Sequence, residues 1–396
     1  MTKVKVKITT NQKPKNSFHM KQNAYAFSSV DMIRKELPTF SESFDRKFIK
    51  YGDLNEYPQF INTLFQKSAI NKTCIMAKAD GVFGGGLVTG DESKNYLLNR
   101  ANTNGSWNDL FERIVLDYVI FSGFAINVIW SNDGETITDL YHLDFTKVRS
   151  GTMNFDTEQP DEYLFSHDWT SIRKFPSKSY PRYDPTKALE QPSQILYFFD
   201  YSPGASYYPI PSYSGALSDI QLDIEVSNFH LNNINNGMAP SLWISLLNGV
   251  PDPATREEIH DEINASFRGS NNAGKAFISF ADDAEHAPQV VPIEAANSDF
   301  YVILEQRITS RILSAHRISS PLLLGLYQDG AGWSSNADEI ETSYQHFLST
   351  VIKPMQKPIL KVLNELFDYN TGTSDIDLQI EPNRLIEAQI VTEEVE

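Results

Sequence analysis

The sequence SGALSDIQLDIEVSNFHLNNINN, residues Ser214–Asn236, and its later counterpart SDFYVILEQRITSRILSAHRIS, residues Ser298–Ser319, decide the fold. Each segment has apolar residues at helical spacing. Two long helices that leave a body, carry a small module and return to the body form a stalk. An ordinary antiparallel helix pair in a globular core has the same spacing, so the pattern alone leaves both interpretations open. The residues expected to pack the two helices are Leu217, Ile220, Ile224, Leu304, Ile308 and Ile312.

The two expected helices differ in charge. The first continues its apolar seam as a partial heptad through Leu231 and Ile234, with Val226 and Phe229 off the seam. Its exposed side is expected to be acidic, and the second helix has arginines outside its apolar stripe. Opposite charges of this kind favour pairing between neighbours. The charged residues are Asp219, Asp223 and Glu225 on the first helix and Arg307, Arg311 and Arg317 on the second.

The stretch between the helices is predicted to be a small α/β module. Its expected elements are a strand at Ser241–Leu247, a helix at Pro253–Phe267 and a strand at Ala276–Phe280, with a further short strand at Val290–Ile293.

Outside this half of the chain the patterns predict a mixed α+β body. We expect helices within Tyr51–Ala79 and at Trp107–Phe121, a hairpin of Phe124–Trp130 and Ile137–Leu143, and a strand at Ile195–Asp200. A helix kinked at Pro354 and Pro358 is expected over Asp338–Phe367. Irregular structure is expected for residues 22–50 (loop and short helix), Gly81–Gly90 (a break), 151–192 (short strands) and Thr371–Glu396 (a weakly structured acidic tail).

Composition restricts the possible classes of protein. The hydrophobic content of 41% indicates a globular chain, and the single cysteine, Cys74, excludes an internal disulfide framework. No apolar run approaches about 18 residues, so no membrane helix is expected. Residues 1–21 carry lysines and no acidic residue, whereas the whole chain has a net charge of −17. An acidic body argues against tight wrapping of DNA, because phosphate neutralisation needs lysine and arginine.

The sequence motifs that would indicate catalysis or ligand binding are weak. Gly269–Lys275 (GSNNAGK) fits the start of a phosphate-binding P-loop, but Ala276 replaces the hydroxyl residue, and a helix leads in and a strand leads out, the reverse of a P-loop. Gly84–Gly86 does not complete a dinucleotide fingerprint. The acidic cluster at Asp282, Asp283 and Glu285 is more typical of a solvated turn than of a cation site. We predict no catalytic residue, no cofactor and no metal.

The ends of the two helices carry a family likeness. NGMAP (Asn236–Pro240) follows the first helix, and the second ends in AHRISSPLLLG (Ala315–Gly325), followed by GAGWSSNADEIETSYQHF (Gly330–Phe347). In this order the motifs resemble the portal proteins of tailed bacteriophages, over most of residues 51–368. In that family a helix ending in R-x-x-x-P-x-L-L-G returns from the clip. The matching residues here are Arg317, Pro321, Leu323, Leu324, Gly325, Ser335 and Asn336, with a single proline where many members have two.

The resemblance implies an α+β portal fold with wing, helical stem, α/β clip and short crown, assembled as a ring. The implied regions are a basic tail (1–21), the wing (22–211), stem helix 1 (212–237), the clip (238–296), stem helix 2 (297–319), a tunnel loop region (320–336), a long kinked wing helix (337–368) and a short crown or C-terminal tail (369–396).

The resemblance also implies a role and partners. The chain would form a ring, usually dodecameric, at one capsid vertex, through which double-stranded DNA is packaged and ejected. Its partners would be the terminase large subunit, the major capsid protein or scaffold, and head–tail connector or adaptor proteins, with no membrane. It would act in the virion and assemble in the host cytoplasm, and it would not be an enzyme.

The expected DNA-facing element is the glycine-rich tunnel loop. Glycines would give it mobility and polar side chains would give weak contacts. Trp333 either packs against a neighbouring subunit, which we favour, or projects into the channel. The loop residues are Leu326, Tyr327, Gln328, Asp329, Gly330, Gly332, Trp333, Ser334, Ser335 and Asn336. The alternatives are another virion connector or structural protein and, less favoured, a nucleotide-binding enzyme that uses Gly269–Lys275.

Overall fold

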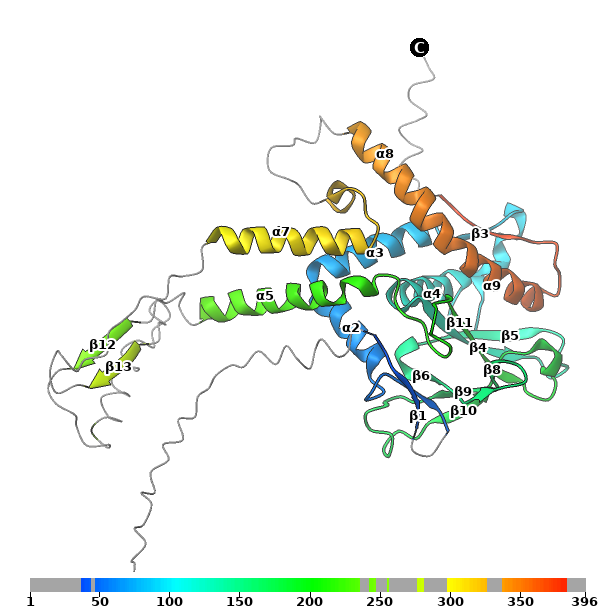
Figure 1. Ribbon diagram of the computed structural model, residues 1–396. Coiled ribbons are helices and arrows are strands. Elements are labelled where there is room, and N and C mark those ends of the chain that lie inside the picture. Colours follow the sequence, from blue (N-terminus) through cyan, green and yellow to red (C-terminus); the bar gives the residue numbers. More distant parts are fainter. Residues whose placement is uncertain are drawn as a thin grey trace, which may run out of the picture.

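The computed structural model describes residues 37–43, 47–235, 242–246, 255, 276–280, 298–325 and 337–382. A body of helices and small sheets occupies one side of the molecule, and two helices, α5 (Leu217–Asn235) and α7 (Ser298–Ala315), project from it side by side (Figure 1). Strands β12 (Leu242–Leu246) and β13 (Ala276–Phe280) lie beyond the far ends of these helices. The predicted stalk is therefore present.

Helix α4 (Trp107–Phe121) and the sheet β11-β4-β5 form the centre of the body. Ser106 and Asp109 close a capping box at the start of α4, and Ser122 ends the helix in the left-handed conformation. The chain then enters β4 (Gly123–Trp130), which pairs antiparallel with β5 (Ile137–Leu143) and β11 (Ser193–Phe199). The predicted helix, hairpin and third strand are confirmed.

A second, smaller set of strands covers one end of the body. Strands β6 (Val148–Ser150), β9 (Glu162–Phe165) and β10 (Lys178–Pro181) form one sheet, and β7 (Met153–Asn154) pairs with β8 (Gln159–Pro160). The expectation of short strands within residues 151–192 is confirmed. The three-residue 3-10 helix η2 (Phe145–Lys147) joins this region to β5, and η3 (Pro185–Lys187) lies before β11.

The N-terminal part of the described chain differs from the expected loop and short helix. Strands β1 (Phe40–Glu42) and β2 (Ile49–Tyr51) form an antiparallel hairpin. Helices α2 (Tyr57–Lys67) and α3 (Ala69–Phe83) follow, within the range where helices were expected, and Pro58 lies in the first turn of α2. The 3-10 helix η1 (Glu92–Asn99) lies before α4.

The glycine-rich stretch and the C-terminal tail pair with each other, whereas the sequence predicted a break and a weakly structured tail. Helix α3 continues to Phe83, and β3 (Leu87–Thr89) then pairs with β14 (Leu378–Ile380) from the tail. A side chain at Gly84 would meet the Glu381 carbonyl oxygen at 2.6 Å, and Gly84 has a φ of 57°. The glycines therefore allow the tail to approach closely where it pairs with this stretch. A local sequence pattern does not reveal such a contact.

The long C-terminal helix is interrupted just before the first of the two prolines that were expected to kink it. Helix α8 (Ala337–Phe347) leads into a π-helical turn at Leu348–Ile352 and then α9 (Lys353–Thr371). Pro354 has no N–H to donate, and the Lys353 N–H bonds to the Leu348 carbonyl, one residue further back than in an α-helix. Pro358 lies inside α9, which continues through it to Thr371. A proline-containing helix is therefore present, and a kink at Pro354 or Pro358 stays a prediction.

Candidate functional site

We refer to the pair of helices α5 and α7 as the stem. Leu217, Ile220, Ile308 and Ile312 are buried, and Ile224 and Leu304 pack partly buried against the same core cluster. All six residues expected to pack the helices therefore lie in one apolar cluster that also contains α2, α3 and α4 residues. Leu231 departs from the expected seam, because 56% of its surface is exposed. The apolar contact is therefore concentrated in the half of the stem nearest the body.

Charged groups connect the two stem helices to each other and join α5 to the body. Arg311 Nη1 of α7 lies 3.1 Å from Asp219 Oδ1 of α5, and His230 Nε2 lies 3.3 Å from Glu305 Oε1 farther along the stem. Asp223 accepts a 2.7 Å hydrogen bond from the Ser68 hydroxyl. The aspartates expected to face solvent instead bind partners within the chain.

The far part of the stem exposes apolar side chains. Leu231 of α5 and Val302 and Ile303 of α7 are among the exposed large apolar residues, and Ile303 is 63% exposed. Exposed apolar groups on neighbouring helices are typical of surfaces that contact another protein. This surface was not predicted, because a helical seam in the sequence does not show how far the body covers it.

Helix α7 ends in a chain reversal at the motif AHRIS. Arg317 adopts a φ of 59°, the Ile318 N–H bonds to the Leu313 carbonyl at 3.0 Å, and the Arg317 N–H bonds to the Ser314 carbonyl at 3.0 Å. These two bonds form a Schellman motif in which arginine takes the position usual for glycine. Ser320 then caps the 3-10 helix η5 (Pro321–Leu324), which ends at Gly325 with a φ of 70°.

His316 fixes this reversal to the body. Its Nε2 lies 2.9 Å from Asn71 Oδ1 of α3, and its ring stacks on Tyr213 at 4.6 Å. The Tyr213 hydroxyl donates to the Ile120 carbonyl at 2.9 Å. Burial, followed by nearby Lys78, holds the pKa of His316 well below its ordinary value, so the ring is neutral. The end of α7 is therefore held against α3 and Tyr213 by buried contacts.

Lys78 and Cys74 lie beside this junction on α3. Lys78 is 3% exposed, and burial lowers its pKa from 10.5 to about 8, with Cys74 opposing and Arg317 adding to the fall. No ion pair joins Lys78 to a carboxylate among the residues that the structure describes. Burial raises the pKa of the Cys74 thiol to about 12, so the thiol is protonated and poorly nucleophilic.

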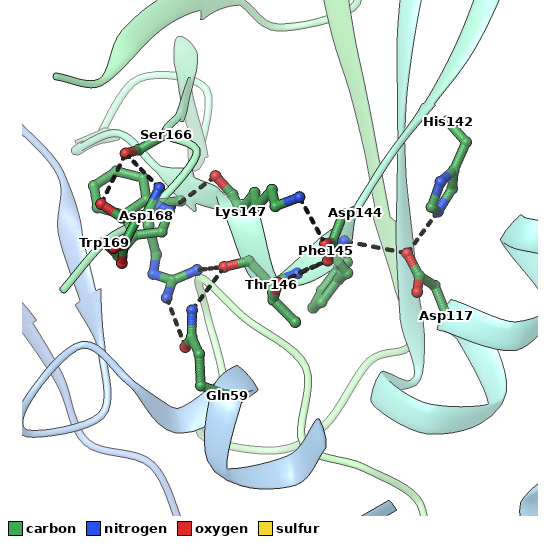
Figure 2. Close-up of polar contacts among 11 residues, drawn as sticks. Gln59, Asp117, His142, Asp144, Phe145, Thr146, Lys147, Ser166, Asp168 and Trp169 are labelled. Carbon is green, nitrogen blue, oxygen red and sulfur yellow. Dashed lines mark hydrogen bonds and ion pairs between the residues drawn. The ribbon is translucent and has the colours of Figure 1, made fainter. Parts of the chain in front are cut away.

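A buried arginine holds the strand region against the helices. Arg149 is 0% exposed; its Nε donates to Asn55 Oδ1 at 2.6 Å and its Nη1 to the Thr146 carbonyl at 2.9 Å. Gln59 donates to the same carbonyl, as Figure 2 shows. The guanidinium also lies 5.1 Å from the ring of Trp169. These contacts fit a structural role, because every polar partner is a neutral group within the chain.

A second polar contact joins α4 to β5. Asp117 Oδ2 lies 2.7 Å from His142 Nε2 and accepts a 3.1 Å hydrogen bond from the Phe145 N–H (Figure 2). Burial raises the pKa of Asp117, and the contact with His142 opposes that rise. Neither this pair nor Arg149 was expected to interact from sequence spacing.

Several expectations fall outside the described residues. The ten residues named for the tunnel loop, all within residues 326–336, lie there, as do the Gly269–Lys275 loop, the Asp282, Asp283 and Glu285 cluster, and most of the predicted clip helix. Ala276 begins β13, so a strand does follow Gly269–Lys275. Within the described parts no cluster of metal-ligating side chains is present, and no helix there is long and apolar enough to cross a bilayer.

The fold and the stem together define a mixed α/β chain built around a paired-helix projection. The chain belongs to the phage portal protein family, whose sequence profile matches residues 70–392. The portal resemblance and the α+β portal fold expected from the sequence are thereby confirmed.

Solved structures show the same fold. The neck of a native gene transfer agent particle, computed with C12 symmetry, matches with a TM-score of 0.55 at 14% identity, covering 91% of this chain and 92% of that one. The neck of an empty particle, computed with C6 symmetry, gives 0.54 at 15% identity, with 85% and 88% covered. An HK97 family phage portal protein from Corynebacterium diphtheriae gives 0.50 at 14% identity, with 83% and 97% covered.

A curated relative matches part of the chain. An uncharacterised protein of Rickettsia bellii is 22% identical over 195 residues, which is 49% of this chain and 46% of that protein. The match thus spans about half the length of the relative.

Proposed function

We propose that this protein is a portal subunit whose copies form a ring at one vertex of a capsid, with double-stranded DNA entering and leaving through the central hole. The observation that carries the proposal is the paired-helix stem, which projects from the body with strands β12 and β13 at its far end, in a chain of the portal family. A ring of twelve copies is supported by the C12 symmetry of one structurally similar neck.

The charge of the chain supports passage of DNA. With a net charge of −17, a ring of copies repels phosphate on average, and few lysine or arginine contacts would hold the duplex in place. The tunnel loop, Leu326–Asn336, would provide weak polar contacts to the moving duplex. The clustered stem residues, which include Ile220 and Ile312, would keep the helices at a fixed spacing around the channel.

The proposed partners follow from the regions. The clip, residues 238–296, would bind the terminase large subunit during packaging and the head–tail connector or adaptor proteins afterwards. The major capsid protein or scaffold would surround the wing. We assign ATP hydrolysis to the separate packaging motor and expect no catalysis by this chain. The protein would assemble in the host cytoplasm and remain at the portal vertex of the virion.

Deleting Gly330–Trp333 tests the DNA role. We expect the shortened loop to leave ring formation intact, because the deletion leaves the apolar stem residues such as Ile220 and Ile312 unchanged, and to reduce packaged or retained DNA at least tenfold. DNA protected from nuclease inside assembled particles is the measurement. Trp333→Phe, which keeps loop length and glycines, serves as the matched control. Normal packaging and retention by the deletion variant would refute the tunnel loop assignment.

A further inference from the structure

Helix α9 presents three exposed lysines on one face. Lys353, Lys357 and Lys361 are separated by four residues each, so they follow one another along the helix at intervals of about 6 Å. Like charges at this spacing oppose one another and destabilise a helix slightly. The arrangement therefore costs stability in a chain that is otherwise rich in acidic residues.

Among the described residues, none of the acidic partners that normally compensate such lysines accompanies these three. In the described parts of the chain no carboxylate lies within 4.0 Å of any of their ammonium groups, whereas Lys94, Lys147 and Lys187 each pair with an aspartate three residues earlier. Glu365 follows Lys361 by one turn, but it lies near the Tyr183 hydroxyl, whose pKa is raised by burial and by this carboxylate. The three α9 lysines thus form a positive stripe that no described carboxylate compensates.

The opposite face of α9 is held firmly. Ile359, Leu363, Leu366 and Phe367 are fully buried. The Gln356 side-chain amide donates to the Val82 carbonyl at 3.1 Å, and Asn364 accepts from the Leu378 N–H at 2.7 Å. A helix fixed in this way presents its lysines in a constant geometry and reduces the entropy lost on binding.

The surface chemistry favours a polyanion over a packed protein partner. No large apolar side chain of α9 is exposed, although protein interfaces usually have an apolar centre. Interfaces with DNA are more polar and more positive. Along one DNA strand phosphates follow about every 3.4 Å of axis, so a stripe about 12 Å long faces roughly three to four phosphates.

We propose that Lys353, Lys357 and Lys361 form a phosphate-binding stripe that holds the backbone of double-stranded DNA. This inference rests on the proposed portal function. Helix α8 begins directly after the predicted tunnel loop, and Lys353 lies 16 residues beyond Ala337, or about 24 Å along the helix. Along the chain the stripe is therefore separated from the segment expected to form the constriction. In the proposed ring we expect the stripe to contact DNA outside the constriction, so that it adds little friction to DNA moving through the channel.

Salt-dependent binding of a labelled 30-base-pair duplex to the full-length protein tests the stripe. The variant K353Q/K357Q/K361Q is compared with K94Q/K147Q/K187Q, which removes the same charge from ion-paired lysines. Fluorescence anisotropy between 50 and 200 mM NaCl gives the slope of log affinity against log salt. We expect the stripe variant to have a slope shallower by about 2.7, equivalent to about 40-fold less affinity loss over this range, and the control to follow the wild type.

Two results would overturn the assignment. Equal slopes for the stripe variant and the wild type would show that these lysines do not contact phosphate. Loss of the ring in the stripe variant but not in the control, measured by native mass spectrometry, would assign the lysines to an acidic surface of a neighbouring subunit. A wild-type chain that forms no ring rejects the portal function, whereas the slope comparison still decides the stripe.

Discussion

Lys78 is a residue at which burial and charge conflict. It lies beside His316 and Arg317 at the junction where the stem returns to the body, and its pKa falls from 10.5 to about 8 chiefly because of burial. Because the folded pKa is below the unfolded one, the charged form is destabilised in the fold. The free energy of unfolding should therefore rise as pH increases from about 8 to about 10.5.

Replacing Lys78 with Met should stabilise the protein near neutral pH. The gain expected from the shift is about 3 kcal/mol at pH 7, at 1.36 kcal/mol per pKa unit, and the rise in stability above pH 8 should disappear. Urea unfolding at pH 7 and pH 10 measures both effects. Lys72→Met, on the exposed face of the same helix, should change neither. A large loss of stability in the Lys78 variant at pH 7 would mean that the ammonium group has a carboxylate partner.

Residue contacts across long sequence separations were not predictable. Arg149 joins Asn55 across 94 residues and His316 joins Asn71 across 245, and no local spacing connects such pairs. From the sequence alone, His316 and Arg317 could be recognised only as part of the motif that ends the second helix. The structure gives that motif a physical reason: a Schellman reversal at Arg317 and a neutral ring stacked on Tyr213.

At the scale of elements, strong periodicity predicted well and tertiary pairing did not. Helix α4 and the β4–β5 hairpin occur where apolar spacing and turn residues indicate them. The pairing of β3 with β14 was missed, because the glycines of residues 84–86 act through a strand that lies far away in sequence. The exposure of Leu231 was also missed, because apolar periodicity does not show how far along the stem the body covers the helices.

The exposed far part of the stem leads to a prediction for assembly. Val302→Asp together with Ile303→Asp should reduce ring formation more than tenfold, because charged groups would replace apolar groups expected to contact the next subunit. Each chain should remain folded, since both side chains are exposed. Analytical ultracentrifugation and circular dichroism measure the two properties.

A matched control adds the same charge elsewhere. Asn62→Asp with Gln66→Glu places two new carboxylates on the exposed face of α2, and we expect this variant to assemble normally. If the control and the stem variant assemble equally well, the far part of the stem is not a subunit contact.

At the scale of the whole molecule, membership of the portal family and the portal fold agree with the sequence-based expectation. The division into wing, stem, clip, tunnel loop and crown stays a prediction, and so does the role of the tunnel loop. Within the tail, Leu378–Ile380 pairs with the body, so this part of the expected crown is tied to the wing region. The proposed function joins these parts into one requirement: copies must close into a ring around a hole.

Electron microscopy of the purified full-length protein, viewed down the ring axis, tests this requirement most directly. We predict closed rings with a central opening wide enough for a DNA duplex, built from copies whose stems pack side by side around it. A chain that remains monomeric under all assembly conditions, or that forms closed particles without a central opening, would contradict the portal function.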